Sequence, residues 1–487
     1  MRIARVLGSV TLNRCLPSFE SASLRLAVPM MTTDLQSDQF PETETLVIWD
    51  ELGAGNGGLV AVSHDTGRNW HPPAGSLPLE KPGQLDFRSI AVLGDHCWIA
   101  GNPGSIVLHT ADGGKSWDRQ ETGQSLPIQA IYFVDDLHGW AVGSLGTILA
   151  TRDGGTSWHR QQSGGTRVAV MGMFSSEETT VYELFSLLSG NDGYLGVAQL
   201  VTTPMRGEGD MFARWKESVS VAGGSSAGQV FTVPRLSEEL TVNPERLRAN
   251  WDRAVDGSVR KLLERKLVKS IRTWRPSVVV TEPSGNSSNA VQQLVQEVVS
   301  SAVQRASDPT WYPEQLGEMG LESWQVSRFF AVEMERKPAV RINTAQLAPR
   351  LGMSVSQHAA RARAVTVRDF EKMSQTIGFT LLSSHDPAIT QGSEMMSGIQ
   401  LAPGGEARRK ISVSAAADVD SLVRVSRQWR NMQQLVDRGL QGSIPAVSLV
   451  GQLDDMLRHL PNDNGGQILF QLARQYHQQG RMDLAAE

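Results

Sequence analysis

The sequence predicts a multidomain protein, in which incomplete β-propeller-like blades precede an α/β domain with a mostly parallel sheet and an α-helical C-terminal region. Three features predict this order: a tryptophan-ended motif that recurs at regular spacing, a central part that alternates strand and helix patterns, and helical periodicity near the end. The 487 residues are enough for about three domains, each with its own core.

The recurring motif has the pattern S/T-x-D-x-G-x-x-W. Its copies SHDTGRNW, TADGGKSW and TRDGGTSW begin 47 and 41 residues apart, a spacing typical of a four-stranded propeller blade. The aspartate can accept hydrogen bonds from its own turn, glycine permits positive φ, and the tryptophan ring can be buried between blades. The residues expected to have these structural roles are Asp65, Gly67, Trp70, Asp112, Gly114, Trp117, Asp153, Gly155 and Trp158.

These motifs are Asp-box (BNR-type) repeats. The paired form W-x-x-G-x-x-G-x-I-L-x-T-x-D-G-G-x-S-W resembles the photosystem II stability/assembly factor family over residues 45–162. The resemblance implies a β-propeller that helps assembly by binding protein and pigment partners. Sialidases also carry Asp boxes, but the arginine cluster and tyrosine nucleophile that they need are not recognisable in this sequence.

Three boxes are too few for a closed ring, because closed propellers have about four to eight blades. The sequence therefore predicts an open β array. Its free edges are expected to pack against the next domain or to pair with another molecule, since bare edges promote aggregation. Further blades supplied by upstream sequence are the alternative.

The central part, residues 166–340, alternates predicted strands and helices. A buried strand begins at Arg167, and a turn rich in hydroxyl and acidic residues, an apolar helix and a second strand follow. Helical spacing over Asp256–Trp274 precedes the strand RPSVVVTEP, and the helical segment SNAVQQLVQEVVSSAVQRA precedes the strand SWQVSRFFAVEM. This alternation predicts a mostly parallel sheet covered on both faces.

Two segments of this domain resemble the PIG-L/LmbE family of zinc-dependent N-acetylglucosaminyl deacetylases. VAVMGMFSSEE stands where that family has A-H-P-D-D-E, and RPSVVVTEPSGNSSNA stands where it has an arginine-proline strand and H-P-D-H. The resemblance, which covers residues 167–335, implies that fold. It places the following residues at the family's site positions: Phe174 at a ligand histidine, Ser176 at the general-base aspartate, Glu177 at the second ligand, Asn286 at the start of H-P-D-H, and Asn289 at the remaining ligand histidine.

Those replacements remove the metal chemistry that the resemblance implies. Catalytic zinc takes three nitrogen, sulfur or carboxylate ligands and an open water position, and phenylalanine cannot bind zinc. No histidine occurs between His159 and His358, so no shift of the alignment restores the site. The sequence therefore predicts a vacated active site without catalytic residues, metal or cofactor. The neighbouring acids Glu177, Glu178, Glu208 and Asp210 are expected to be solvated.

The remaining segments carry weaker patterns. Residues 1–44 are expected to form a poorly ordered extension, and residues 341–415 a mixed region of short helices, one strand and a linker. Residues 416–487 have helical patterns, and LARQYHQQGRMDLAA resembles a tetratricopeptide unit. The two cysteines, Cys15 and Cys97, cannot form a disulfide framework or a cysteine zinc site.

Composition narrows the partners. The net charge of -5 gives no basic footprint for a nucleic acid, and no apolar run is long enough to span a membrane. The N-terminus has no convincing signal peptide, which favours the cytoplasm and leaves export open. The leading hypothesis is a noncatalytic interaction protein with protein partners and the capacity to self-associate. The alternatives are a zinc-dependent deacetylase with an altered site and a glycan-binding protein.

Overall fold

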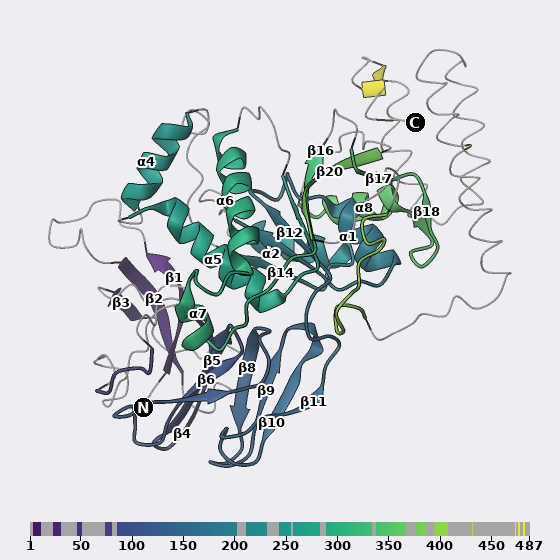
Figure 1. Cartoon of the computed structure of the whole chain (residues 1–487). Coiled ribbons are helices and arrows are strands. Elements are labelled where there is room, and N and C mark those ends of the chain that lie inside the picture. The colour runs from purple at the N-terminus through teal and green to yellow at the C-terminus, as the bar shows by residue number, and fades with distance from the viewer. Residues whose placement is uncertain are drawn as a thin grey trace.

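The computed structural model describes residues 74–79, 85–201, 211–230, 243–254, 257–282, 289–333, 338–366, 376–385 and 394–407, with the backbone of three N-terminal strands and isolated positions after residue 430. Figure 1 shows the blades on one side of the α/β domain. No described helix is long and apolar enough to cross a membrane. Most of the predicted helical tail, 416–487, lies outside the described residues, and so does most of the tetratricopeptide-like segment.

The N-terminal strands are β1 (Ile3–Val10), β2 (Ser23–Met30) and β3 (Leu46–Asp50), which form an antiparallel sheet in the order β1-β2-β3. Within residues 1–44, which were expected to form a poorly ordered extension, the structure describes the backbone of β1 and β2. The sequence holds a signal for β2, because SLRLAVPM has an apolar residue at every second position from Leu24 to Met30.

Two blades follow, each a four-stranded antiparallel sheet. The second and third Asp boxes connect the last two strands of each blade, where the repeat pattern predicts them, whereas the first box, Ser63–Trp70, lies outside the described residues. Blade 1 contains β4 (Asp86–Leu93), β5 (His96–Asn102), β6 (Ile106–Thr110) and β7 (Asp118–Glu121). Blade 2 contains β8 (Ile128–Phe133), β9 (Gly139–Gly143), the short helix η4 (Ser144–Gly146), β10 (Ile148–Thr151) and β11 (His159–Gln162).

One face of blade 1 is buried against blade 2. The Trp98 ring stacks on Phe133 with ring centroids 3.7 Å apart, and its Nε1–H donates to the backbone carbonyl of Gly154 at 2.8 Å. Because β5 of blade 1 and β8 of blade 2 both have apolar side chains at this contact, the two blades share a core. That core contains Trp98, Ala100 and Val107 of blade 1 and Ile128, Ile131, Phe133, Ala141 and Leu149 of blade 2.

The opposite face of blade 1 is covered by the α/β domain. Met319 and Leu321 of that domain pack into a cluster that also contains Cys97 and Trp117. Hydrogen bonds reinforce the contact: Arg119 donates to the backbone carbonyls of Gly317 and Glu318. The described blades thus form an open pair, and one side of the pair is closed by packing within the same chain.

The α/β domain is built on a seven-stranded sheet in the order β14-β13-β12-β15-β16-β20-β17. The five strands from β14 to β16 are parallel, and β20 is antiparallel to both neighbours, which confirms the predicted mostly parallel sheet. Their bounds are β12 (Val170–Phe174), β13 (Gly196–Leu200), β14 (Ser226–Gln229), β15 (Val278–Thr281), β16 (Arg328–Glu333), β17 (Val340–Asn343) and β20 (Thr376–Ser384).

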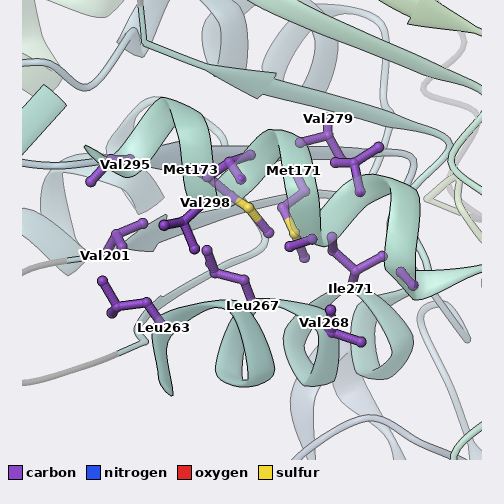
Figure 2. Packing of buried hydrophobic residues seen from close by; sticks show 14 of the residues in the cluster. Met171, Met173, Val201, Leu263, Leu267, Val268, Ile271, Val279, Val295 and Val298 are labelled. Atoms are coloured by element: carbon purple, nitrogen blue, oxygen red, sulfur yellow. The ribbon is translucent and has the colours of Figure 1, made fainter. Parts of the chain in front are cut away.

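Helices cover both faces of the sheet. Figure 2 shows one face, where Leu263 and Leu267 of one helix and Val298 of another meet Met171 and Met173 of β12. The helices of this face are α4 (Pro244–Ala254), α5 (Val259–Trp274) and α6 (Ala290–Ala306), with α7 (Pro313–Gly317) nearby. The other face packs against α1 (Tyr182–Phe185), the π-helix η5 (Ser186–Asn191), α2 (Met211–Val221) and α8 (Val355–Arg363).

The domain extends beyond the predicted boundary at residue 340. Strands β17 and β20, with the small hairpin β18 (Leu347–Ala348) and β19 (Met353–Ser354), belong to it. Residues 394–407, expected within a linker, lie against the domain: Arg167 donates to the carbonyl of Ala402, and the side chain of Met395 is buried. The composition of residues 394–407 predicted a loop correctly. Whether such a loop joins two domains as a linker or packs against one of them depends on tertiary contacts, and here it packs against the α/β domain.

Candidate functional site

The turn after β12 occupies the place where open α/β sheets usually bind ligands, at the carboxyl ends of the strands. Phe174, the last residue of β12, is fully buried in the core on one face of the sheet, together with Phe185. A Cβ atom on Gly172 would lie 2.5 Å from the Phe174 ring, so the ring folds back along its own strand. The residue that the resemblance aligns with a ligand histidine is therefore a core side chain.

A carboxylate that the sequence interpretation missed, Glu282, lies at the end of β15 and holds this turn. Its Oε1 accepts hydrogen bonds from the backbone N–H of Ser175 and from the Thr179 hydroxyl, both at 2.6 Å. The side chain is almost completely buried. The signal in the sequence was an acid directly after the apolar strand VVVT, at the same sheet edge as the turn.

The turn is also tied internally. The Ser176 hydroxyl accepts from the backbone N–H of Thr179, and the Thr180 hydroxyl donates to the Ser176 carbonyl. Glu177 is buried and Glu178 is exposed, so the expectation that both are solvated is wrong for Glu177. The chain folds back on Glu177, whose backbone carbonyl accepts from the Tyr182 hydroxyl.

Asn289 has a structural role at the start of α6. Its side-chain oxygen accepts from the backbone N–H groups of Val291 and Gln292, which makes it the N-cap of the helix. Asn286 lies outside the described residues, as do Glu208 and Asp210. Phe174 thus lies in the core, and Asn289 caps a helix.

These residues do not fit a catalytic zinc ion. Such a site needs three ligands with nitrogen, sulfur or carboxylate donors around an open position. Within the described part of the chain, no group of three or more histidine, cysteine, aspartate or glutamate side chains could hold a metal ion. At this edge the carboxylate of Glu282 is engaged in the hydrogen bonds that close the turn.

The Asp boxes are the second candidate site, and their geometry is structural. In blade 2, Asp153 Oδ1 accepts from the backbone N–H of Ser157 at 2.9 Å and from the Thr151 hydroxyl at 2.8 Å. Asp112 in blade 1 accepts the equivalent bonds from Ser116 and Thr110. The glycines Gly114 and Gly155 have φ of 91° and 93°, as the motif requires.

These hydrogen bonds lower the pKa of both aspartates. The bonds to Ser157, first from its side chain and then from its backbone, lower the pKa of Asp153 to about 2. The equivalent bonds from Ser116 lower the pKa of Asp112 well below its usual range. Both carboxylates are therefore charged at neutral pH and are occupied by their own turns, which leaves them a structural role.

The tryptophans of the boxes differ in their surroundings. Trp117 is buried in the cluster that contains Leu321 of the α/β domain, and Trp158 is half-buried, with its ring edge-on to Phe133. Trp158 therefore packs beside the interface between the two blades. Trp117 instead lies between blade 1 and the α/β domain.

The outer face of blade 2 is exposed, although its counterpart in blade 1 is buried. Strand register makes Trp140 equivalent to Trp98 and Val142 equivalent to Ala100. Trp98 is 0% exposed and Ala100 1%, whereas Trp140 is 38% and Val142 41% exposed. The large exposed side chains of β8, β9 and the turn between them, called the blade 2 face below, are Tyr132, Val134, Leu137, Trp140 and Val142.

Comparison with known families supports the resemblance of the blades. Residues 52–130 match the family described as photosynthesis system II assembly factor YCF48. Residues 1–76 match the family described as ethanolamine utilisation protein EutN/carboxysome, so the first Asp box lies in a segment that both families match. Each match covers well under half of the chain.

Individual proteins agree with the first of these matches. The chloroplastic photosystem II stability/assembly factor HCF136 of Arabidopsis thaliana is 35% identical over 68 residues, which are 14% of this chain and 17% of that protein. The corresponding protein of Oryza sativa subsp. japonica is also 35% identical over 68 residues, 16% of its length. The chain therefore spans less than a fifth of the length of these relatives.

Solved structures with similarity to the chain include both types of domain. YCF48 bound to D1 peptide is 28% identical, with 25% of this chain and 38% of that chain covered and a TM-score of 0.20. The N,N'-diacetylchitobiose deacetylase from Pyrococcus horikoshii is 15% identical, with 41% and 71% covered and a TM-score of 0.29. The similarity to photosystem II assembly factors is placed on the chain by the family match over residues 52–130.

Proposed function

We propose that this chain is a noncatalytic interaction protein of the assembly-factor type, whose blades bind a protein partner through the blade 2 face. The observation that carries the proposal is the difference between equivalent residues: Trp98 is buried by a neighbouring blade, and Trp140 is 38% exposed. Large exposed apolar patches on soluble domains usually mark interaction sites. Similarity to assembly factors over residues 52–130, which include blade 1 and the start of β8, supports this role.

The contact between the two blades indicates what the partner presents. Blade 2 covers the equivalent face of blade 1 with apolar side chains of a β-sheet, and the carbonyl of Gly154 accepts the indole N–H of Trp98. The partner is therefore expected to offer an apolar sheet surface and a backbone acceptor for the Trp140 indole. In blade 1, the face that corresponds to this covering face of blade 2 already packs against Met319 and Leu321. Blade 1 of a second copy therefore offers no such surface.

The D1 peptide named with YCF48 is a suitable first probe. The full chain should bind it, and Trp140→Ser should weaken binding at least ~10-fold, which corresponds to about 1.4 kcal/mol. Trp311→Ser is the matched control, since Trp311 is 41% exposed on the α/β domain. Sedimentation velocity of the full chain tests self-association: a dimer that Trp140→Ser dissociates would assign the face to a second copy instead.

Absence of catalysis is the other half of the proposal. The turn after β12 is supported as a vacated site by the buried Phe174, the capping Asn289 and the engaged Glu282. The purified chain should contain no stoichiometric zinc by elemental analysis and should release no acetate from N-acetylglucosamine derivatives in zinc-supplemented buffer. One zinc ion per chain, lost in Glu177→Gln, would favour the alternative of a deacetylase with an altered site.

A further inference from the structure

Tyr132 and Trp140 form an open aromatic pair on the blade 2 face. They lie directly opposite each other on the neighbouring strands β8 and β9, so their side chains project from the same side of the sheet. Tyr132 is 56% exposed and Trp140 is 38% exposed. The ring contacts among the described residues do not include this pair, so neither ring covers the other.

The neighbours of the pair are small side chains. Ala150 of β10 lies opposite Trp140 on the far side of β9, and Ala130 precedes Tyr132 by two positions on β8. Both alanines project from the same side of the sheet as the aromatic pair, because side chains alternate along a strand. A methyl group is too small to cover an indole or a phenol ring, which leaves ring surface open to a ligand.

The equivalent tryptophan of blade 1 shows which groups an indole in this position receives. The Phe133 ring stacks on the Trp98 ring with the planes 10° apart. The backbone carbonyl of Gly154 accepts the indole N–H of Trp98 at 2.8 Å. By equivalence, Trp140 is suited to a ligand that places a ring on the indole and a backbone carbonyl beside the indole N–H.

The backbone at this pair is already used by the sheet. β9 pairs with β8 on one side and with β10 on the other, so its N–H and C=O groups lie in the plane of the sheet. An ordinary peptide segment that packed on this face would turn N–H groups toward an apolar surface without acceptors, which costs free energy. Proline has no backbone N–H, and therefore avoids that cost.

We propose that the Tyr132–Trp140 pair binds a proline-rich segment of the partner, with a prolyl ring packed on the two aromatic rings and a carbonyl of the segment accepting the Trp140 indole N–H. The ring and carbonyl of proline correspond to the two groups that Trp98 receives. A polyproline II segment is extended before it binds, so it loses little entropy, and such segments dock in aromatic-lined grooves. The inference rests on the proposed function; the other three side chains of the blade 2 face remain for the partner's apolar surface.

The test uses fluorescein-labelled octaproline, titrated with the full chain and followed by fluorescence anisotropy. Octaproline should bind with Kd below ~1 mM, and a labelled glycine-serine octapeptide should bind at least ~10-fold more weakly. Trp140→Ser and Tyr132→Ser should each weaken octaproline binding ~10-fold or more. Trp140→Phe keeps a ring and removes the indole donor, so it should weaken binding by a smaller factor of about 2 to 10.

Trp311→Ser is the matched control. Trp311 is likewise an exposed tryptophan next to a tyrosine, Tyr312. The Arg305 guanidinium, however, lies 3.7 Å from the centroid of the Trp311 ring and covers one of its faces. Substitution of Trp311 should therefore leave the Kd for octaproline within ~2-fold of that of the unchanged chain.

Other occupants of the pair would give different results. A glycine-serine octapeptide with two phenylalanines that binds more tightly than octaproline would overturn the proposal, because the pair would then prefer an aromatic ring. Octaproline binding that neither serine substitution changes, or a Kd above ~1 mM, would overturn it as well. The D1 peptide tests the proposed function separately: if its binding depends on Trp140 while octaproline fails to bind, the interaction face stands and its preference for proline is wrong.

Discussion

Blade 1 and blade 2 have the same strand order and the same Asp-box geometry, but only blade 1 has both faces covered. One face of blade 1 packs on blade 2 and the other packs on the α/β domain, whereas the blade 2 face has five large apolar side chains in solvent. The comparison shows that a repeat pattern determines how each sheet folds but not which faces are buried. The position of a repeat in the array determines that.

The largest expected effect concerns the two equivalent tryptophans. Trp98→Ala should destabilise the full chain by about 3–5 kcal/mol, because it removes a fully buried ring and the indole hydrogen bond to Gly154. Trp140→Ala should change stability by less than about 1 kcal/mol, since the ring is partly solvated. Urea unfolding followed by circular dichroism measures the free energy of unfolding of both variants. Equal losses would contradict the difference in burial between the two tryptophans.

The two box tryptophans give the next comparison. Trp117→Ala should cost about 3 kcal/mol, because the ring is buried between blade 1 and the α/β domain. Trp158→Ala should cost less, since Trp158 is only half-buried beside Phe133. Thermal melting of each variant provides the measurement, and an unchanged melting temperature for Trp117→Ala would contradict the observed packing of blade 1.

A smaller effect tests the cover of blade 1 from the other side. Leu321→Ala should cost about 2–3 kcal/mol, because Leu321 is buried against the blade rather than in the sheet core. Leu382→Ala is the control, as Leu382 is 36% exposed on β20. Hydrogen exchange should show faster exchange in β5 and β6 for Leu321→Ala alone; equal protection in both variants would mean that the domain does not support the blade.

The smallest expected effect is a change in the pH dependence of stability, and it should be the same in both blades. The lowered pKa of Asp153, about 2, means that the charged form stabilises the folded state above the ordinary aspartate pKa near 4, and that this contribution is lost as the pH falls toward 2. Urea midpoints measured from pH 5 to pH 2 should fall less steeply for Asp153→Asn and for Asp112→Asn. A slope that neither substitution changes would argue against the hydrogen-bonded boxes.

Local patterns predicted the regular elements well. The helical spacing over Asp256–Trp274 corresponds to α5, the segment around Asn289 begins α6 through a side-chain cap, and the apolar run VVVT is β15. Each of these signals acts within one element, through periodicity, capping or β-branched composition, so one segment of sequence contains it.

The candidate site was only partly accessible from the sequence. Comparison with a known motif drew attention to Phe174 and Asn289, but not to Glu282, whose role depends on the backbone of Ser175, 107 positions earlier in the chain. Likewise, Glu177 is acidic and follows a turn, which predicts exposure, yet the fold of the turn buries it. Contacts between distant segments decide both cases.

The sequence by itself determined the order of the parts, the Asp-box turns and the absence of histidine between His159 and His358, because each depends on residue identity along the chain. Only the tertiary structure decided that β17 and β20 complete the sheet and that residues 394–407 pack against the α/β domain. It also decided that Trp98 is buried and Trp140 is not. The physical reason is that burial depends on which surfaces meet, and equivalent residues in two repeats meet different neighbours.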